Sequence, residues 1–285
     1  MTLRIRFTAA FALLMTLLAP VAPSLAQEGV TLSGVNGVRL LDAGIFVVSG
    51  QASTAREETF EFLQRPDGGV TLLSATTMSD GAMRVQARYD YDATWKAVAA
   101  FGQGLYGDEP VQVVLRASPG AVAIRVRGAR TTVDKSVPCP GGCFMDMAPS
   151  GSPMFVMTRN YDRAKGGEQS FQWAAQDLAR PATSPDDQRA ALRLRRELPV
   201  KRADGSSLKI RDYEMIERIP TPGGGMFVME FDLWTDDAER PMGYRINKIA
   251  GKPPAAPIVA FRRGYEDIRA QVVRQRGRYP FPRKG

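Results

Sequence analysis

Apolar and polar side chains alternate with a period of two residues along much of this chain, and this pattern constrains its fold most strongly. The alternation is regular over residues 111–117 and 121–127, and the Ser118-Pro119-Gly120 sequence between them is a turn signal. The two segments therefore predict a β-hairpin with one buried and one wet face. Residues 83–91 alternate in the same way, which is typical of an antiparallel sheet.

Further segments extend this pattern. Residues 58–64 and 70–78 flank a Pro-Asp-Gly-Gly turn, residues 208–219 and 226–234 flank a Gly/Pro-rich turn, and residues 242–249 add a strand. We expect a mainly β (α+β) fold, in which long hairpins form a strongly curved antiparallel sheet or open half-barrel. Residues 27–273 would form a single β-rich domain, in which 38–135 and 168–250 are possible related halves.

The stretch from residue 138 to residue 161 interrupts the β pattern and contains both cysteines, Cys139 and Cys143. In an oxidising compartment, two cysteines at this spacing most simply form a disulfide, and the Pro-Gly-Gly sequence between them allows a tight turn. Met145 and Met147 follow, and they could pack in the core or offer soft ligands to Cu(I). We favour packing, and we expect neither a metal nor another cofactor.

The same stretch predicts a short helix from Ser152 to Tyr161. Met154, Met157 and Tyr161 have the spacing of one helical face, and Ser152-Pro153 is a helix-start signal. A single helix in the middle of the chain is well placed to pack on the concave face of a curved sheet.

The two ends of the chain carry different signals. Residues 1–26 have the pattern of a secretory signal peptide, because basic residues precede an apolar segment that is too short to span a bilayer. We therefore expect an exported, periplasmic protein of a Gram-negative bacterium, with no transmembrane segment after signal removal. Tyr265, Ile268 and Val272 have helical spacing and predict a short C-terminal helix, and the basic residues 274–285 predict a flexible tail.

The chain contains no histidine, which rules out a Ser-His-Asp or Cys-His relay and a histidine zinc site within it. Glu230 and Asp232 could act as a pair of carboxylates on one strand, near the Glu-x-Asp-x-Glu pattern of laminarinase-type glycoside hydrolases. Trp234 occupies the third acid position, so we expect these acids on the solvated face of the sheet instead. The chain has no phosphate-binding loop and its basic residues are dispersed, so we expect no nucleic-acid partner.

The signal peptide, the long hairpins, the segment around Trp95 and the helix from Ser152 to Tyr161 together resemble a class of bacterial periplasmic proteins. These are the bent-sheet, half-barrel proteins of the lipoprotein-carrier and glycolipid-binding type. The resemblance implies an apolar cavity for acyl chains or a lipid-like ligand, and no catalysis. The residues that we expect to line this cavity are Met154, Phe155, Met157, Tyr161, Trp95, Phe171, Trp173, Phe227 and Phe231.

We therefore expect a non-catalytic periplasmic protein that binds or carries a lipid or glycolipid-like ligand. Two alternatives stay open at this point. One is a structural or interaction module of the envelope that binds an envelope protein, and the other is a carboxylate-dependent glycan hydrolase. The formal net charge of +8 marks a basic protein, and such a charge can favour anionic lipid head groups or acidic polymers or can serve solubility alone.

Overall fold

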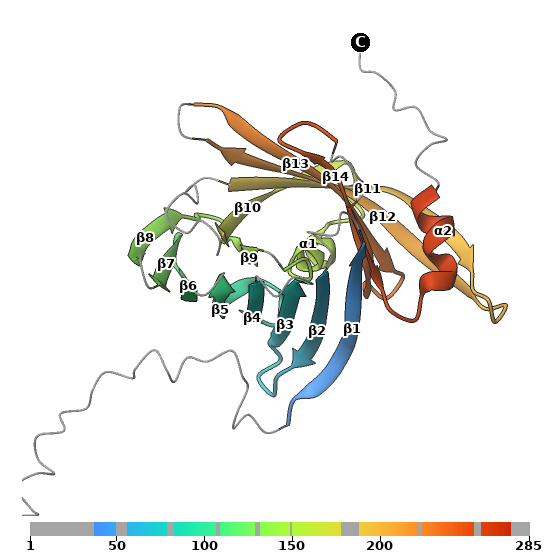
Figure 1. Cartoon of the computed structure of the whole chain (residues 1–285), viewed down its shortest axis with the longest axis horizontal. Coiled ribbons are helices and arrows are strands. Elements are labelled where there is room, and N and C mark those ends of the chain that lie inside the picture. The colour runs from blue at the N-terminus through green and yellow to red at the C-terminus, as the bar shows by residue number, and fades with distance from the viewer. Residues whose placement is uncertain are drawn as a thin grey trace, which may run out of the picture.

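In the computed structural model, fifteen strands form one open, strongly curved sheet that coils around a short helix (Figure 1). The structure describes residues 37–49, 56–78, 83–106, 109–128, 132–148, 150–177, 188–221, 224–253 and 258–274. The expected mainly β fold with a curved antiparallel sheet and long hairpins is confirmed. The predicted signal peptide and most of the basic tail lie outside the described residues.

The strands fall into two arms. The first arm contains β1 (Arg39–Ser49), β2 (Arg56–Gln64), β3 (Val70–Met78), β4 (Met83–Tyr91), β5 (Ala97–Tyr106), β6 (Glu109–Ser118), β7 (Ala121–Gly128) and β8 (Thr132–Pro138). The second arm contains β9 (Phe144–Ala148), β10 (Glu168–Asp177), β11 (Gln188–Lys201), β12 (Ser207–Pro220), β13 (Met226–Asp236), β14 (Pro241–Ile249) and β15 (Ile258–Arg262).

Most sequence neighbours pair as antiparallel hairpins, as the turn signals predict. Gly120, for example, has a φ of 77° between β6 and β7, a backbone conformation that glycine adopts without strain. The sheet order is β8-β7-β6-β5-β4-β3-β2-β1-β15-β14-β13-β12-β11-β10-β9. The first and last strands therefore lie side by side in the middle of the sheet, and β8 and β9, which are consecutive in sequence, form its two edges.

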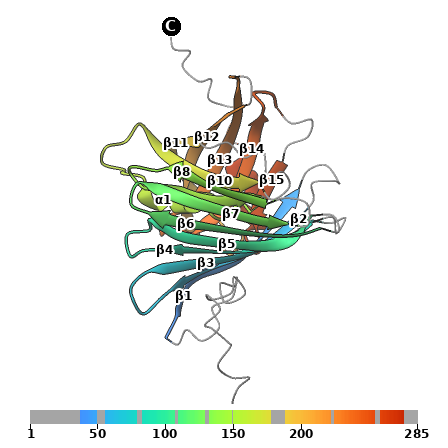
Figure 2. The ribbon, with the colours of Figure 1, turned by 90° about the vertical axis from the view of Figure 1, so that its left-hand side faces the viewer.

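The sheet coils until its last strands, β9 and β10, contact the first arm. Figure 2 shows the strands of the first arm crossing those of the second at a steep angle. Met147 of β9 lies against the inner face of β5, where a Cβ atom added to Gly102 would be 2.7 Å from the methionine sulfur. Gln172 of β10 donates a hydrogen bond of 2.5 Å to the carbonyl of Pro138 at the end of β8.

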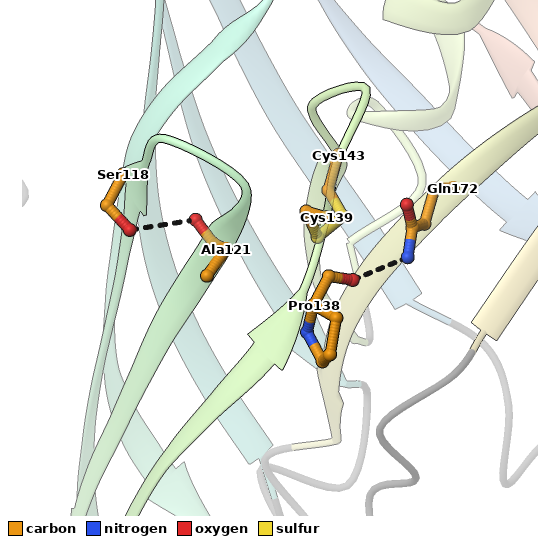
Figure 3. Close-up of a disulfide and its surroundings, with 6 residues drawn as sticks. All are labelled: Ser118, Ala121, Pro138, Cys139, Cys143 and Gln172. Carbon is orange, nitrogen blue, oxygen red and sulfur yellow. Dashed lines mark hydrogen bonds between the residues drawn. A yellow bond between two sulfur atoms is a disulfide. The ribbon is translucent and has the colours of Figure 1, made fainter.

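A disulfide links Cys139 and Cys143 at this junction, with Cα atoms 5.6 Å apart (Figure 3). The predicted bond is thus present in the structure. The backbone N–H of Cys139 also donates to the carbonyl of Gly120, so the turn is attached to the β6–β7 hairpin. The bonded turn directs the chain from the outer edge of the first arm into the interior of the coil.

The two helices lie on opposite faces of the sheet (Figure 1). Helix α1 (Met154–Asn160) lies inside the coil, as expected for the central helix, although it is shorter than the predicted range. Helix α2 (Glu266–Arg274) is the predicted C-terminal helix and lies on the outer face of the second arm. No helix within the described ranges is long and apolar enough to cross a membrane.

The outer face of the second arm is buried because α2 covers it. Ile268 and Val272 of α2 join a cluster that contains Trp234 of β13, Met242 of β14 and Phe261 of β15. The sheet is therefore buried on both faces here, and the simple alternation of inner apolar and outer polar residues does not hold.

Candidate ligand site inside the coiled sheet

The inner face of the sheet and α1 share one apolar core, which holds most of the residues that the sequence predicts to bind a ligand. Phe155 packs against Phe46 of β1 with ring centroids 5.6 Å apart. The predicted residues buried in this core are Met154, Phe155, Met157, Tyr161, Trp173 and Phe231. Trp95 and Phe171 are partly buried against it, and Phe227 near the start of β13 is half-buried. Contact of these residues with a ligand stays a prediction.

A buried carboxylate connects α1 to the sheet. Glu58 of β2 is fully buried and accepts hydrogen bonds from the backbone N–H groups of Gly151 and Ser152, both at 2.8 Å. These groups lie just before α1, where no preceding helical carbonyl can accept their hydrogen bonds. Glu58 therefore positions the start of α1 against the inner face of the sheet.

A second buried acid, Asp146 of β9, lies nearby. Its carboxylate accepts hydrogen bonds from the hydroxyl of Tyr89 at 3.4 Å and from the backbone N–H of Met147 at 2.7 Å. Burial raises the pKa of Asp146 well above its usual value, and the charges of Glu217 and Glu58 raise it further. The protonated, uncharged form of Asp146 is therefore favoured, and this form can donate a hydrogen bond.

Glu217 of β12 is the third acid on the inner face, in line with Tyr213 and Met215. Burial raises its pKa to about 7. At neutral pH this side chain therefore exchanges between an uncharged hydrogen-bond donor and a carboxylate.

A charged arginine, Arg56, lies among these acids. Arg56 of β2 donates a hydrogen bond of 2.7 Å from its Nη2 to the hydroxyl of Tyr244 on β14. Burial disfavours the charge of Arg56, but Tyr244, Glu58 and Asp146 outweigh burial and raise its pKa. The arginine therefore stays charged inside a region that also contains carboxyl groups.

Several buried polar atoms of this region have no hydrogen-bond partner in the part of the chain that the structure describes. They are Arg56 Nε, Thr76 Oγ1, Tyr91 Oη, Ser152 Oγ and Trp173 Nε1. Thr76 is opposite Glu58 in the β2–β3 register, and Ser152 donates its backbone N–H to the same Glu58. The pKa of Tyr91 is raised well above its usual value by burial and by Asp146. Thr76, Tyr91, Ser152 and Arg56 therefore lie near Glu58 or Asp146.

An open pocket of about 440 Å³ lies at β3, β4, β5 and β6, and most of its lining residues are exposed. Thr76, whose hydroxyl has no partner among the described residues, contributes to its lining. Gln103 donates a hydrogen bond of 3.2 Å to Gln86 along the same wall. The full lining is Ala75, Thr76, Thr77, Val85, Gln86, Gln103, Gly104, Leu105, Pro110, Val111 and Gln112.

The sequence predictions missed the polar part of this site, although the sequence contains a signal for it. Glu58 has the same phase as Phe60 and Phe62 in the alternation of β2, and Glu217 has the same phase as Met215 in β12. An acid in phase with apolar residues is directed to the core rather than to water. The phase of the alternation alone therefore indicates that both acids are buried.

The acids considered for a hydrolase lie elsewhere. The expectation that Glu230 and Asp232 are solvated is wrong for Asp232, which is fully buried on the outer face of β13. Its carboxylate accepts hydrogen bonds from Arg195 at 2.6 Å and from Arg245. Glu230 is paired with Lys248 at 2.7 Å. Asp232 is therefore part of a buried ion cluster with two arginines on the outer face of the sheet.

The fold is shared with a bacterial protein of known structure. The chain is similar to a β-barrel-like protein of domain of unknown function DUF1849 from Brucella abortus, with a TM-score of 0.50 and 9% identity over 77% of this chain and 94% of that chain. It also aligns with a DUF1089 family protein from Pseudomonas aeruginosa, with a TM-score of 0.37 and 15% identity over 70% and 89% of the two chains. No protein-family model and no curated protein sequence matches the chain.

The first of these similarities supports a fold of the bacterial β-barrel-like kind, in agreement with the coiled sheet described above. This similarity concerns the fold alone and is not specific to the lipoprotein-carrier type that the sequence resembles.

Proposed function

We propose that this protein is a non-catalytic periplasmic binding protein that holds a lipid or glycolipid-like ligand inside the coiled sheet. The observation that carries the proposal is the set of five buried polar atoms without partners among the described residues, placed inside a core that is also rich in apolar side chains. An amphiphilic ligand has apolar chains that suit the core and oxygen atoms that suit these groups.

The magnitude of the mismatch supports a bound partner. A buried polar group without a hydrogen bond costs ~1–3 kcal/mol. Five such groups together approach the ~5–15 kcal/mol by which a typical domain is stable. Some of them must therefore be satisfied in the working protein, either by a ligand or by buried water.

The chemistry of the groups suits hydroxyl and carbonyl oxygens. Trp173 Nε1 and Arg56 Nε can only donate hydrogen bonds, while the hydroxyls of Tyr91 and Ser152 can donate or accept. Protonated Asp146 would add a donor. Ester carbonyls and sugar hydroxyls supply the matching acceptors and donors.

The apolar part of the site is adaptable. Met154 and Met157 are flexible side chains that can repack around an acyl chain, and they come from the helix that fills the coil. The pocket between β3 and β6 offers a route from solvent toward Thr76. The disulfide between Cys139 and Cys143 supports the proposed export, since such bonds persist in oxidising compartments.

The test is to express the full chain in a Gram-negative host, purify it from the periplasm without detergent, and examine it by native mass spectrometry. Organic extraction with lipid analysis follows on the same sample. We expect a protein–lipid complex whose excess mass matches the extracted molecule. Tyr91→Phe should reduce its occupancy, because it removes one hydroxyl partner without changing the ring.

Tyr265→Phe is the matched control, because Tyr265 packs against the outer cluster beside α2. It should retain full occupancy. A purified protein that carries no lipid and takes up none from lipid vesicles would show that water, and not a ligand, satisfies the buried groups.

A further inference from the structure

The other end of α1 carries a different polar arrangement. The guanidinium of Arg159, in the last turn of α1, lies over the indole ring of Trp95 at 4.3 Å from the ring centroid. Trp95 belongs to the turn between β4 and β5. The pair is therefore separated by the length of the helix from Glu58, which contacts the residues before α1.

Trp95 is held firmly in an unusual conformation. Its φ is 65°, a left-handed value that bulky residues rarely adopt and that costs of order 1–3 kcal/mol. Asp92 Oδ1 fixes the turn by accepting hydrogen bonds from the backbone N–H groups of Thr94 and Lys96. Asn160 Nδ2 donates to the carbonyl of Trp95 at 3.4 Å, which attaches the turn to the helix.

The indole ring is packed as well as the backbone. Phe62 and Tyr91 lie beside it, with centroid distances of 5.9 and 6.3 Å. The ring therefore forms a fixed platform for the guanidinium of Arg159, and this platform fixes the direction of the arginine N–H groups.

Arg159 is partly buried and yet has no counter-ion in the part of the chain that the structure describes. Among the described residues, none forms an ion pair with it or accepts a hydrogen bond from its guanidinium. Burial lowers its pKa, and the more distant acids Glu239, Asp42 and Asp236 oppose this effect without outweighing it. A charged group removed from water without a partner is costly.

The neighbouring acids cannot serve as that partner, because each already has its own arginine. Asp42 accepts hydrogen bonds of 2.9 and 2.7 Å from Arg262. Asp236 pairs with Arg240 at 2.6 Å. Glu239 pairs with Arg211 at 2.5 Å.

We propose that Arg159, stacked on Trp95, is a binding site for an oxyanion, namely a phosphate or carboxylate group. Stacking uses the flat face of the guanidinium and leaves its N–H edge available, and that edge matches two oxygens of a phosphate or carboxylate. The fixed platform lowers the entropic cost of binding, because the arginine is already oriented. The proposal does not require a ligand in the interior, because Arg159 lies at the opposite end of α1 from Glu58.

The test is isothermal titration of the full-length protein with two probes, inorganic phosphate and dihexanoyl phosphatidic acid below its micelle concentration. We expect wild-type protein to bind at least one probe and Arg159→Gln to bind it at least about tenfold more weakly, a difference of ~1.4 kcal/mol. The affinity of Arg159→Lys should lie between those of the wild type and Arg159→Gln, because lysine keeps the positive charge but lacks the paired N–H groups of the guanidinium.

Arg163→Gln is the matched control, since Arg163 lies four residues further on and its side chain is 52% exposed. It should bind like the wild type, and circular dichroism should show that all variants are folded. Tighter binding of the phosphatidic acid would identify a lipid headgroup, and equal binding would identify free phosphate.

Two outcomes would overturn the proposal. One is binding by Arg159→Gln with wild-type affinity, and the other is no binding of either probe by the wild type. Ser152→Ala removes an interior hydroxyl at the opposite end of α1 from Arg159 and should leave phosphate binding unchanged, so that failure of the interior site and failure of this site are distinguishable.

Discussion

Replacing Glu217 with glutamine should make the protein more stable at alkaline pH, which is unusual for the removal of a charged residue. Glu217 is buried on the inner face of β12, and burial raises its pKa from 4.5 to about 7. Below pH 4.5, the pKa of Glu217 in the unfolded chain, this acid is protonated in both the folded and the unfolded chain. As the pH rises through this window, the unfolded chain ionises first, so the free energy of unfolding falls until the folded value is passed.

The expected magnitude follows from the two pKa values. Since one pKa unit corresponds to ~1.4 kcal/mol, the difference between 4.5 and about 7 makes the full loss about 3.5 kcal/mol. Glutamine keeps the shape of the protonated acid and cannot ionise. The advantage of Glu217→Gln over the wild type should therefore grow by about 2.5 kcal/mol between about pH 5 and about pH 8.5. Relief of the repulsion on Asp146 acts in the same direction.

The assay is urea unfolding followed by tryptophan fluorescence at these two pH values. Glu214→Gln is the matched control, because Glu214 lies on the outer face of the same strand and pairs with Arg193 at 2.5 Å. It should lower stability at both pH values. If the stability difference between Glu217→Gln and the wild type does not change with pH, Glu217 is not buried as the structure indicates.

Three further predictions concern the framework. Asp232→Asn should lower the free energy of unfolding by ~3–5 kcal/mol, because it weakens the ion pairs of the partly buried Arg195 and Arg245. A free energy of unfolding in urea that is close to that of the wild type would contradict this prediction. Gly151→Ala should lower the free energy of unfolding by ~1–3 kcal/mol in the same assay, because the added methyl group overlaps the Tyr244 ring. Gly141→Ala is the control and should be nearly neutral, because a methyl group added there meets open space. Equal effects of the two substitutions would contradict the close packing of Gly151 against Tyr244. Cys139→Ala with Cys143→Ala should lower thermal stability by less than ~3 kcal/mol, because the closed loop is short, and complete loss of folding would show a larger role.

Many of the strands and both helices could be predicted from the sequence because their signals are local, but β9 lies in the stretch that we expected to interrupt the β pattern. The alternation over residues 83–91 places Val85, Ala87, Tyr89 and Tyr91 in the core, as the structure shows. The helical spacing of Met154 and Met157 identifies α1 in the same way. Each of these patterns needs only a few neighbouring residues to be read.

The sheet order could not be predicted, because it depends on contacts between distant segments. β1 pairs with β15 across more than 200 residues, and β9 pairs in parallel with β10. The burial of Asp232 has the same origin, since the helix that covers the outer face contains Ile268 and follows more than 30 residues later. Glu58 and Glu217 are different, because their phase in the alternation indicates that they are buried.

The central claim, that a ligand occupies the coil, is tested most directly by the indole N–H resonance of Trp173 in a ¹⁵N-correlated NMR spectrum. Trp173 Nε1 is buried without a partner among the described residues, whereas Trp234 Nε1 donates to Asp212 at 3.2 Å and serves as an internal control. The spectrum of protein as purified is compared with that of protein refolded after lipid extraction. We predict that the Trp173 signal moves on extraction and returns when the lipid is restored, while the Trp234 signal stays in place. A Trp173 signal that is identical in all three samples would contradict a ligand at this site.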